Sequence, residues 1–197
     1  LELLDAKPEH TLLDVGCGLG LLLEAASCYT ARLRGIDVSE VAIAEARRRL
    51  PEAEVRLGNA ECLPYADDSF DLVCCLGSLE RMLDAAKALD EMRRVGRTAA
   101  RYCFLVRNSD AIGWKYLARF MRRTRRLSHA GADSLQNWRG LFESRGFRVI
   151  EIWPDQYPLH RLRGWARLGL KRVDFREPMC GRIDHANEFI FILEKEA

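Results

Sequence analysis

The chain has 197 residues, of which 48% are hydrophobic and 30% are charged, so a disordered or low-complexity protein is excluded. No apolar run approaches the roughly 20 residues that a transmembrane helix needs, and the first residues lack the pattern of a signal peptide. A chain of this length fits one domain better than two. We therefore expect a single domain over residues 1–197.

The net charge of +2 conceals an uneven distribution of charge. Residues 1–96 carry 11 basic and 18 acidic side chains, a net −7, whereas residues 97–197 carry 20 and 11, a net +9. This split suggests that the second half faces an anionic partner or surface. The alternative is that the two halves neutralise each other within one fold.

The seven cysteines form no CxxC pair and have no zinc-type spacing with a histidine. This pattern predicts free, mostly buried thiols in a reducing compartment, no metal site, and a cytoplasmic location.

Short apolar runs alternate with helical patterns through the first half of the chain. The predicted strands are Thr11–Val15, Leu33–Ile36, Glu54–Leu57, Phe70–Leu76 and Ala99–Val106, and the predicted helices are Leu19–Cys28, the stretch from the cap Ser39 to Arg49, and Leu79–Arg94. Such a succession implies a parallel sheet with helices on both faces, and doubly wound topologies are the leading candidates.

In the second half, helices are predicted at Trp114–Leu127 and at Ser134–Arg145, the latter ended by Gly146, and strands at Phe147–Trp153 and Glu188–Glu194. Residues 114–127 and 161–172 combine arginines with tryptophan and leucine, which is typical of helices that lie on an anionic membrane surface. A lid helix that packs its apolar stripe on the sheet explains the same pattern.

The strongest motif is Asp14-Val15-Gly16-Cys17-Gly18-Leu19-Gly20, which follows a strand and opens a helix. Its glycines permit a tight turn and the close approach of a ligand. Asp37 ends the second strand, 17 residues after Gly20, where a carboxylate can accept both hydroxyls of a ribose.

The spacing of this turn indicates which nucleoside it binds. The dehydrogenase fingerprint is G-x-G-x-x-G, whereas this turn is G-x-G-x-G with Asp14 two residues before its first glycine. An acid is poorly placed beside a pyrophosphate and well placed beside an amine. A ligand with an ammonium group and no phosphate is therefore favoured over a nicotinamide dinucleotide.

On these residues the chain resembles the class I S-adenosylmethionine-dependent methyltransferases, in the broad group that contains the ubiquinone and menaquinone biosynthesis enzymes. The resemblance spans about residues 10–108 and includes Gly35 to Ser39, Gly58 to Glu61, Leu63 to Tyr65 and Ser69 to Asp71. It implies a Rossmann-like doubly wound sheet, mostly parallel, of seven strands with the last antiparallel. It also implies that residues 1–108 bind the cofactor, that residues 109–187 form the acceptor site, and that residues 188–194 form the last strand.

Carried over by residue, the resemblance gives four groups of cofactor-binding positions. The methionine part is surrounded by Asp14, Gly16, Cys17, Gly18 and Gly20. Asp37 holds the ribose and Val38 lies against the adenine, whose edge meets Asn59 and Ala60. Beyond the fourth strand the cofactor is lined by Leu76, Gly77 and Ser78. Two positions depart from the family pattern. Asn59 stands for the usual Asp, and its amide can still bond an adenine edge. Arg81 replaces the His that the family often has at this position, so no role carries over to it. Glu80 and Arg81 are expected to begin a helix and form its charge pairs.

The reaction is an in-line displacement on an activated methyl group, so a base is needed only for a protonated acceptor. His129 and His160 lie in the variable segments and are weak candidates for that base. We expect methyl transfer from S-adenosylmethionine to a small or lipid-like acceptor, with oxygen favoured by analogy and S-adenosylhomocysteine as product. A non-catalytic partner subunit that binds the cofactor is the alternative, and RNA or protein substrates rank lower because no nucleic-acid module is recognised.

Overall fold

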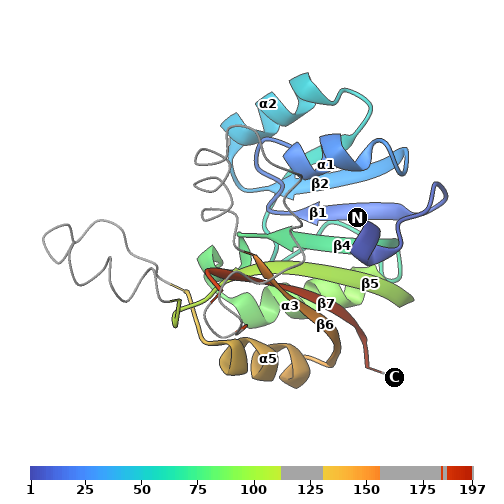
Figure 1. Ribbon diagram of the computed structural model, residues 1–197. Helices are drawn as coiled ribbons and strands as arrows, with labels where there is room; N and C mark the ends of the chain where they lie inside the picture. Colours follow the sequence, from blue (N-terminus) through green and yellow to red (C-terminus); the bar gives the residue numbers. More distant parts are fainter. Residues whose placement is uncertain (112–130, 156–182, 184–185, 197) are drawn as a thin grey trace, which may run out of the picture.

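A seven-stranded sheet forms the centre of the molecule in the computed structural model, which describes residues 1–111, 131–155, 183 and 186–196 (Figure 1). Its strands are β1 (Thr11–Val15), β2 (Arg32–Asp37), β3 (Glu54–Leu57), β4 (Phe70–Leu76), β5 (Gly96–Arg107), β6 (Phe147–Asp155) and β7 (Glu188–Lys195). Their order is β3-β2-β1-β4-β5-β7-β6, with β7 antiparallel to both of its neighbours and the other pairs parallel. The predicted doubly wound sheet with an antiparallel last strand is confirmed.

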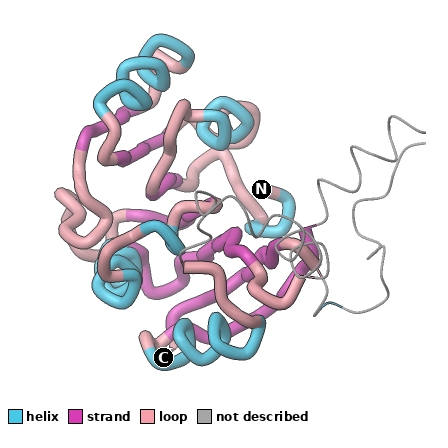
Figure 2. Tube along the Cα trace, turned by 90° about the vertical axis from the view of Figure 1, so that its left-hand side faces the viewer, coloured by secondary structure: helices cyan, strands magenta, loops and turns pink. Residues whose placement is uncertain are grey.

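Helices cover both faces of this sheet (Figures 1 and 2). They are η1 (Glu2–Leu4), α1 (Leu21–Ala26), α2 (Glu40–Arg49), η2 (Leu79–Arg81), α3 (Ala85–Val95) and α5 (Leu135–Ser144). Neighbouring strand residues point to opposite faces, so Leu12 and Leu72 pack with α1 and α2, whereas Leu13 and Val73 pack with α3 and α5. The sheet is therefore buried on both sides, as near-continuous apolar strands require.

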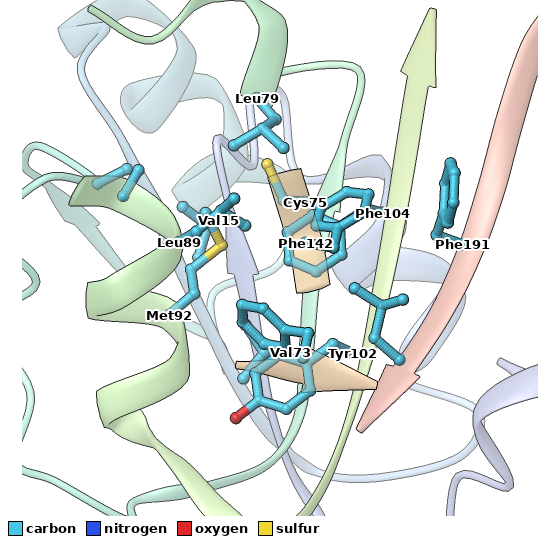
Figure 3. Close-up of a cluster of buried hydrophobic side chains, with 14 of the residues drawn as sticks. Val15, Val73, Cys75, Leu79, Leu89, Met92, Tyr102, Phe104, Phe142 and Phe191 are labelled. Atoms are coloured by element: carbon cyan, nitrogen blue, oxygen red, sulfur yellow. The ribbon is translucent and has the colours of Figure 1, made fainter. Parts of the chain in front are cut away.

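The core on the α3 and α5 face is rich in aromatic rings (Figure 3). Phe142 of α5 packs 4.9 Å from Phe104 of β5 and 5.0 Å from Phe191 of β7, measured between ring centroids. Leu89 and Met92 of α3 are fully buried in the same cluster. These contacts fix α3, and with it the chain that enters α3 from the end of β4.

Two helices have other boundaries than predicted. The first helix runs from Leu21 to Ala26 rather than from Leu19 to Cys28, and it starts after Gly20, which has a left-handed backbone with φ of 78° and serves as its N-cap. The predicted helix from Leu79 to Arg94 is wrong over its first turns: η2 ends at Arg81, Met82 is extended, and α3 begins only after Asp84. The Asp84 carboxylate accepts the amide of Lys87 at 2.9 Å, and this cap sets the start of α3.

The carboxyl ends of the parallel strands β1 to β5 meet at one edge of the sheet. Strand order reverses its direction between β1 and β4, which are neighbours in space but not in sequence. In open α/β sheets a ligand binds in the crevice at such a switch point. The loops after β1, β2, β3 and β4 therefore define where the site must lie.

Several sequence predictions fall outside the described residues. These are the helix at Trp114–Leu127, the basic stretch 161–172, and the histidines His129 and His160. The six described cysteines carry no disulfide, and Cys28 and Cys62 are exposed. Within the described ranges no helix combines the length and apolar character needed to cross a membrane.

Candidate cofactor site

A cavity of about 360 Å³ opens at the predicted edge of the sheet, a volume within the range of small-molecule sites. Its lining comes from the loops after β1, β2, β3 and β4, and consists of Gly16, Ile36, Asp37, Val38, Gly58, Asn59, Ala60, Glu61, Ser78, Arg81, Met82 and Leu83. The structure thus brings together six of the twelve predicted cofactor-binding residues. The other six, which are Asp14, Cys17, Gly18, Gly20, Leu76 and Gly77, are not among the lining residues.

Four backbone amides of the glycine turn after β1 donate hydrogen bonds within the protein. The amides of Gly16 and Cys17 donate to the carbonyl of Ile36 at 2.8 and 3.1 Å. The amide of Gly18 donates to Asp37 Oδ2 at 2.9 Å, and that of Gly20 donates to the carbonyl of Cys17 at 2.9 Å. A turn that holds a pyrophosphate must point free N–H groups at it. This turn is therefore built for a ligand without a phosphate at that place.

Asp37 is half-buried at the end of β2 and lines the cavity. Its Oδ2 accepts the amide of Gly18 and its Oδ1 accepts the amide of Ser39, each at 2.9 Å. An ionised carboxylate offers about four lone-pair sites, so acceptor capacity remains on both oxygens. Two vicinal ribose hydroxyls match that remaining capacity.

Apolar side chains stand exposed at the rim of the cavity. Val38 is 72% exposed and Leu83 is 98% exposed, and both belong to the lining. Asn59, another lining residue, accepts the amide of Glu61 through its side-chain oxygen at 2.9 Å, which fixes the orientation of the Asn59 side chain. Exposed apolar groups around an oriented amide suit the faces and edge of a purine base.

The loop that carries Asn59 and Ala60 is anchored to α3. Glu91 accepts the amide of Leu63 at 2.7 Å, and Arg94 donates to the carbonyls of Leu63 and Tyr65 at 3.1 and 2.9 Å. Arg94 also bonds Glu91, and this hydrogen bond lowers the pKa of the Glu91 carboxyl. The loop therefore keeps its place through charged hydrogen bonds.

Asp14 lies buried on β1, below the turn. Burial and the nearby charge of Asp37 raise its pKa to about 7. None of the hydrogen bonds among the described residues reaches its carboxylate, so the ionised form lacks a partner there. A ligand ammonium group would supply one, since an opposite charge restores the ionised carboxylate.

The remaining glycine-turn residues have packing roles. Cys17 is buried under Gly35, where an added Cβ would meet the Cys17 sulfur at 2.9 Å, and burial raises the pKa of its thiol to about 12. A Cβ on Gly20 would lie 3.2 Å from Ala46 of α2, so this glycine allows α1 and α2 to approach. Leu76 and Gly77 end β4, and the Gly77 amide donates to the carbonyl of Leu105 at 2.9 Å.

Sequence reasoning missed half of the lining. Arg81, Met82 and Leu83 were assigned to a continuous helix. In the structure Arg81 ends η2, Met82 and Leu83 lie between η2 and α3, and all three line the cavity. The signal was present, since Asp84 is a strong N-cap residue placed just before the regular apolar stripe. Ile36, Gly58 and Glu61 also line the cavity, and a Cβ on Gly58 would meet Ile36 at 2.7 Å.

Fold and site together define a Rossmann-like nucleoside-binding protein with an acid at the end of β2 and a turn unsuited to phosphate. Comparison with known proteins narrows this class. A family model described as a methyltransferase domain matches residues 13–104. Together with the methyltransferase relatives, this match supports an S-adenosylmethionine-dependent methyltransferase that uses S-adenosylmethionine as its methyl donor.

Three relatives illustrate this similarity. The uncharacterised methyltransferase YcgJ of Bacillus subtilis is 29% identical over 196 residues, covering 93% of this chain and 75% of that protein. Its crystal structure superposes with a TM-score of 0.68 at 23% identity, over 99% of this chain and 95% of that one. The O-methyltransferase cnsE of Penicillium expansum is 34% identical over 77% of this chain, and a demethylmenaquinone methyltransferase of Beutenbergia cavernae is 29% identical over 88%.

Coverage of the relatives varies. The chain spans 72% of the Beutenbergia enzyme but only 56% of cnsE. The similarity therefore does not assign the acceptors or partners of these proteins to this chain.

Proposed function

We propose that this methyltransferase transfers the methyl group to an oxygen atom of a small-molecule or lipid-like acceptor and releases S-adenosylhomocysteine. The observation that carries this proposal is Asp37, which lines the cavity with spare acceptor capacity. It lies beside a turn in which the amides of Gly16, Cys17, Gly18 and Gly20 are bonded within the protein. The preference for oxygen is supported by the relative named as an O-methyltransferase. The relative named as a demethylmenaquinone methyltransferase supports the wider class of acceptors.

Twelve residues are proposed to bind or shape the cofactor pocket. Asp37 takes the ribose hydroxyls, Val38 packs on adenine, and Asn59 with Ala60 meets the adenine edge. Gly16 and Ser78 border the methionine part, and the buried carboxylate of Asp14 faces its ammonium group. Cys17, Gly18, Gly20, Leu76 and Gly77 support this arrangement from behind the lining.

The bound cofactor supplies an electrophilic methyl group on a sulfonium centre. The chain's own residues then have to orient the two reactants and exclude water, because displacement at an activated carbon needs alignment more than it needs covalent help. The anchored loop from Gly58 to Tyr65 and the ordered turn after β1 provide that rigidity. His129 and His160 stay weak candidates for a base that an acceptor with a bound proton requires.

Residues 109–187 are proposed to build the acceptor site within a single domain. Contact with an anionic membrane through residues 114–127 and 161–172 is part of the proposal and rests on their sequence pattern alone. A cytoplasmic location is supported by the unpaired state of the six described cysteines.

Calorimetric titration with S-adenosylmethionine, S-adenosylhomocysteine and NADH tests the site. Micromolar binding of the first two without binding of NADH is the expected result. A screen of acceptors follows, with anionic liposomes included and S-adenosylhomocysteine as the readout. Binding without turnover across a broad screen would favour the partner-subunit alternative, and absence of binding would overturn the cofactor site.

A further inference from the structure

Arg81 lies at the wall of the cofactor cavity, and its guanidinium has no partner among the described residues. It is exposed and belongs to the lining, and none of the hydrogen bonds or ion pairs within the described ranges involves its side chain. Every other arginine in those ranges has a hydrogen bond or an ion pair from its side chain. Arg81 is therefore the one described arginine whose side chain has no partner among the described residues.

The turn that carries Arg81 is fixed by the two residues that precede Arg81. The neighbouring Glu80 has a side chain only 1% exposed, and its Oε1 lies 3.4 Å from Nε of Arg107 in β5. Leu79, on the other side of Glu80, is fully buried in the core. Two consecutive buried residues thus hold η2 in place, and Arg81 is the residue of η2 that faces the cavity.

The two acids of the cavity lining form no ion pair with Arg81 among the described residues. Asp37 accepts two backbone amides, and Glu61 accepts the amide of Asp84 at 3.0 Å. Among the lining residues Arg81 is the one cation. Because no described acid pairs with the guanidinium, its N–H donors are open to an anion in the cavity, and its planar fork matches a carboxylate in particular.

We infer that Arg81 binds an oxyanion in this cavity, a carboxylate or ionised hydroxyl that belongs either to the acceptor or to the methionine end of the cofactor. The inference rests on the proposed function and names the charge of the group that the site receives. For an acceptor oxyanion, a lone pair on oxygen forms the bond to the methyl carbon while the carbon–sulfur bond breaks. The electron pair of the broken bond stays on sulfur. Atoms and charge balance without a proton acceptor, because the oxygen arrives ionised.

The test compares wild type with Arg81→Gln and Arg81→Lys. Calorimetry measures binding of S-adenosylmethionine and of decarboxylated S-adenosylmethionine, which lacks only the carboxylate. Turnover is measured on a panel of ionised phenols and carboxylic acids and on their neutral amides and alcohols. Lys87→Gln is the control, since Lys87 is an exposed cation on α3 that is not among the lining residues.

Two results support the inference and identify the source of the oxyanion. If Arg81→Gln weakens S-adenosylmethionine by about 10- to 100-fold and leaves the decarboxylated form unchanged, the oxyanion is the cofactor's. If cofactor binding stays within about twofold while kcat/KM for ionised acceptors falls at least about 10-fold, it is the acceptor's. Arg81→Lys should fall between, because it keeps the charge without the fork.

The inference is overturned if Arg81→Gln changes neither quantity, if it weakens both cofactor forms equally, or if it acts no differently from Lys87→Gln. It is also overturned if only neutral acceptors react and cofactor binding is unaffected. Failure of the wild type to bind S-adenosylmethionine overturns the proposed function itself, and the inference falls with it. The titration of the wild type thus separates the two failures.

Discussion

The carboxylate of Asp37 accepts the backbone amide of Gly18 at 2.9 Å, which ties the end of β2 to the turn after β1. The same side chain accepts the amide of Ser39, where α2 begins. One acid thereby fixes two backbone segments and still presents acceptor capacity to the cavity. The ligand-binding conformation of the turn is therefore set before a ligand arrives, which reduces the entropy lost on binding.

Replacing Asp37 by alanine should weaken S-adenosylmethionine binding by about 2 kcal/mol or more, because charged hydrogen bonds to the ribose are lost and the Gly18 amide loses its acceptor. Asp37→Asn should lose less, since an amide oxygen can still accept one backbone amide. Calorimetry measures both, with Glu40→Ala, an exposed acid in the first turn of α2, as control. Unchanged affinity in Asp37→Ala would remove the ribose assignment.

The strands and the position of the site could be predicted from the sequence because their determinants are local. Phe70–Leu76 is one apolar run between polar residues, and the structure places β4 over the same residues. The spacing along the chain predicts Asp37 and the glycine turn as parts of the site. Asp37 and Gly16 line the cavity, and Gly18 of the turn donates a hydrogen bond to Asp37. Patterns of neighbouring residues decide such features.

The roles of single residues were harder to predict because distant contacts decide them. Cys17 has the sequence position of a cofactor residue, but Gly35 of the next strand leaves a space into which its side chain packs. Met82 and Leu83 continue the 3.6-residue repeat of α3, and the cap at Asp84 ends that repeat in the structure. Their place at the cavity follows from how η2 is held by β5, which no local pattern encodes.

Gly16 and Gly18 both have left-handed backbones, with φ of 74° and 51°, yet they should respond differently to substitution. A Cβ on Gly16 would meet the Cβ and Oγ of Ser78 at 2.5 Å, whereas a Cβ on Gly18 would meet nothing within 4 Å. Gly18→Ala should cost only the backbone strain, about 1 kcal/mol of unfolding free energy. Gly16→Ala should cost more and should also displace Ser78 from the cavity wall.

Urea unfolding and calorimetry with S-adenosylmethionine test this pair. We expect a clear loss of cofactor affinity in Gly16→Ala and near-wild-type affinity in Gly18→Ala once both are folded. Equal effects of the two substitutions would contradict the contact with Ser78. The double variant Gly16→Ala with Ser78→Gly provides a further check, since removing the facing side chain should restore part of the free energy of unfolding.

Glu91 should stabilise the fold at neutral pH and lose this contribution in acid. Its pKa is lowered by the hydrogen bond from Arg94, assisted by the Leu63 amide. A carboxyl whose folded pKa is depressed contributes stability above its unfolded pKa of about 4.3 and loses it as pH falls through the folded value. Glu91→Gln should therefore lower the free energy of unfolding by about 1 kcal/mol at pH 7, and the difference from wild type should shrink below pH ~4.

Urea unfolding at pH 7 and at a pH below ~4 measures the difference in unfolding free energy between wild type and Glu91→Gln. Glu143→Gln is the control, because Glu143 pairs with Arg139 on the exposed surface of α5 and such pairs contribute little. A difference between wild type and Glu91→Gln that is independent of pH would mean that Glu91 acts through packing rather than charge.

Asp14 should make cofactor binding depend on pH. Its pKa of about 7 reflects burial and the charge of Asp37, so near pH 6 the free protein holds a proton on this carboxyl. If the cofactor's ammonium group binds beside it, the ionised form is favoured and the proton is released on binding. Affinity should then rise up to about tenfold per pH unit toward pH 7 and level off above it.

Calorimetry in buffers of different ionisation enthalpy counts the released proton directly, and the expected count near pH 6 approaches one. Asp14→Asn should bind more weakly at neutral pH, because the charge is gone, and should show a flat affinity between pH ~5.5 and ~7.5. Asp90→Asn is the matched control, since Asp90 lies on α3 and pairs with Arg145 away from the cavity lining. Binding of the wild type near pH 6 without proton release would show that the ammonium group does not lie beside Asp14. Its raised pKa would then be a property of the buried strand alone.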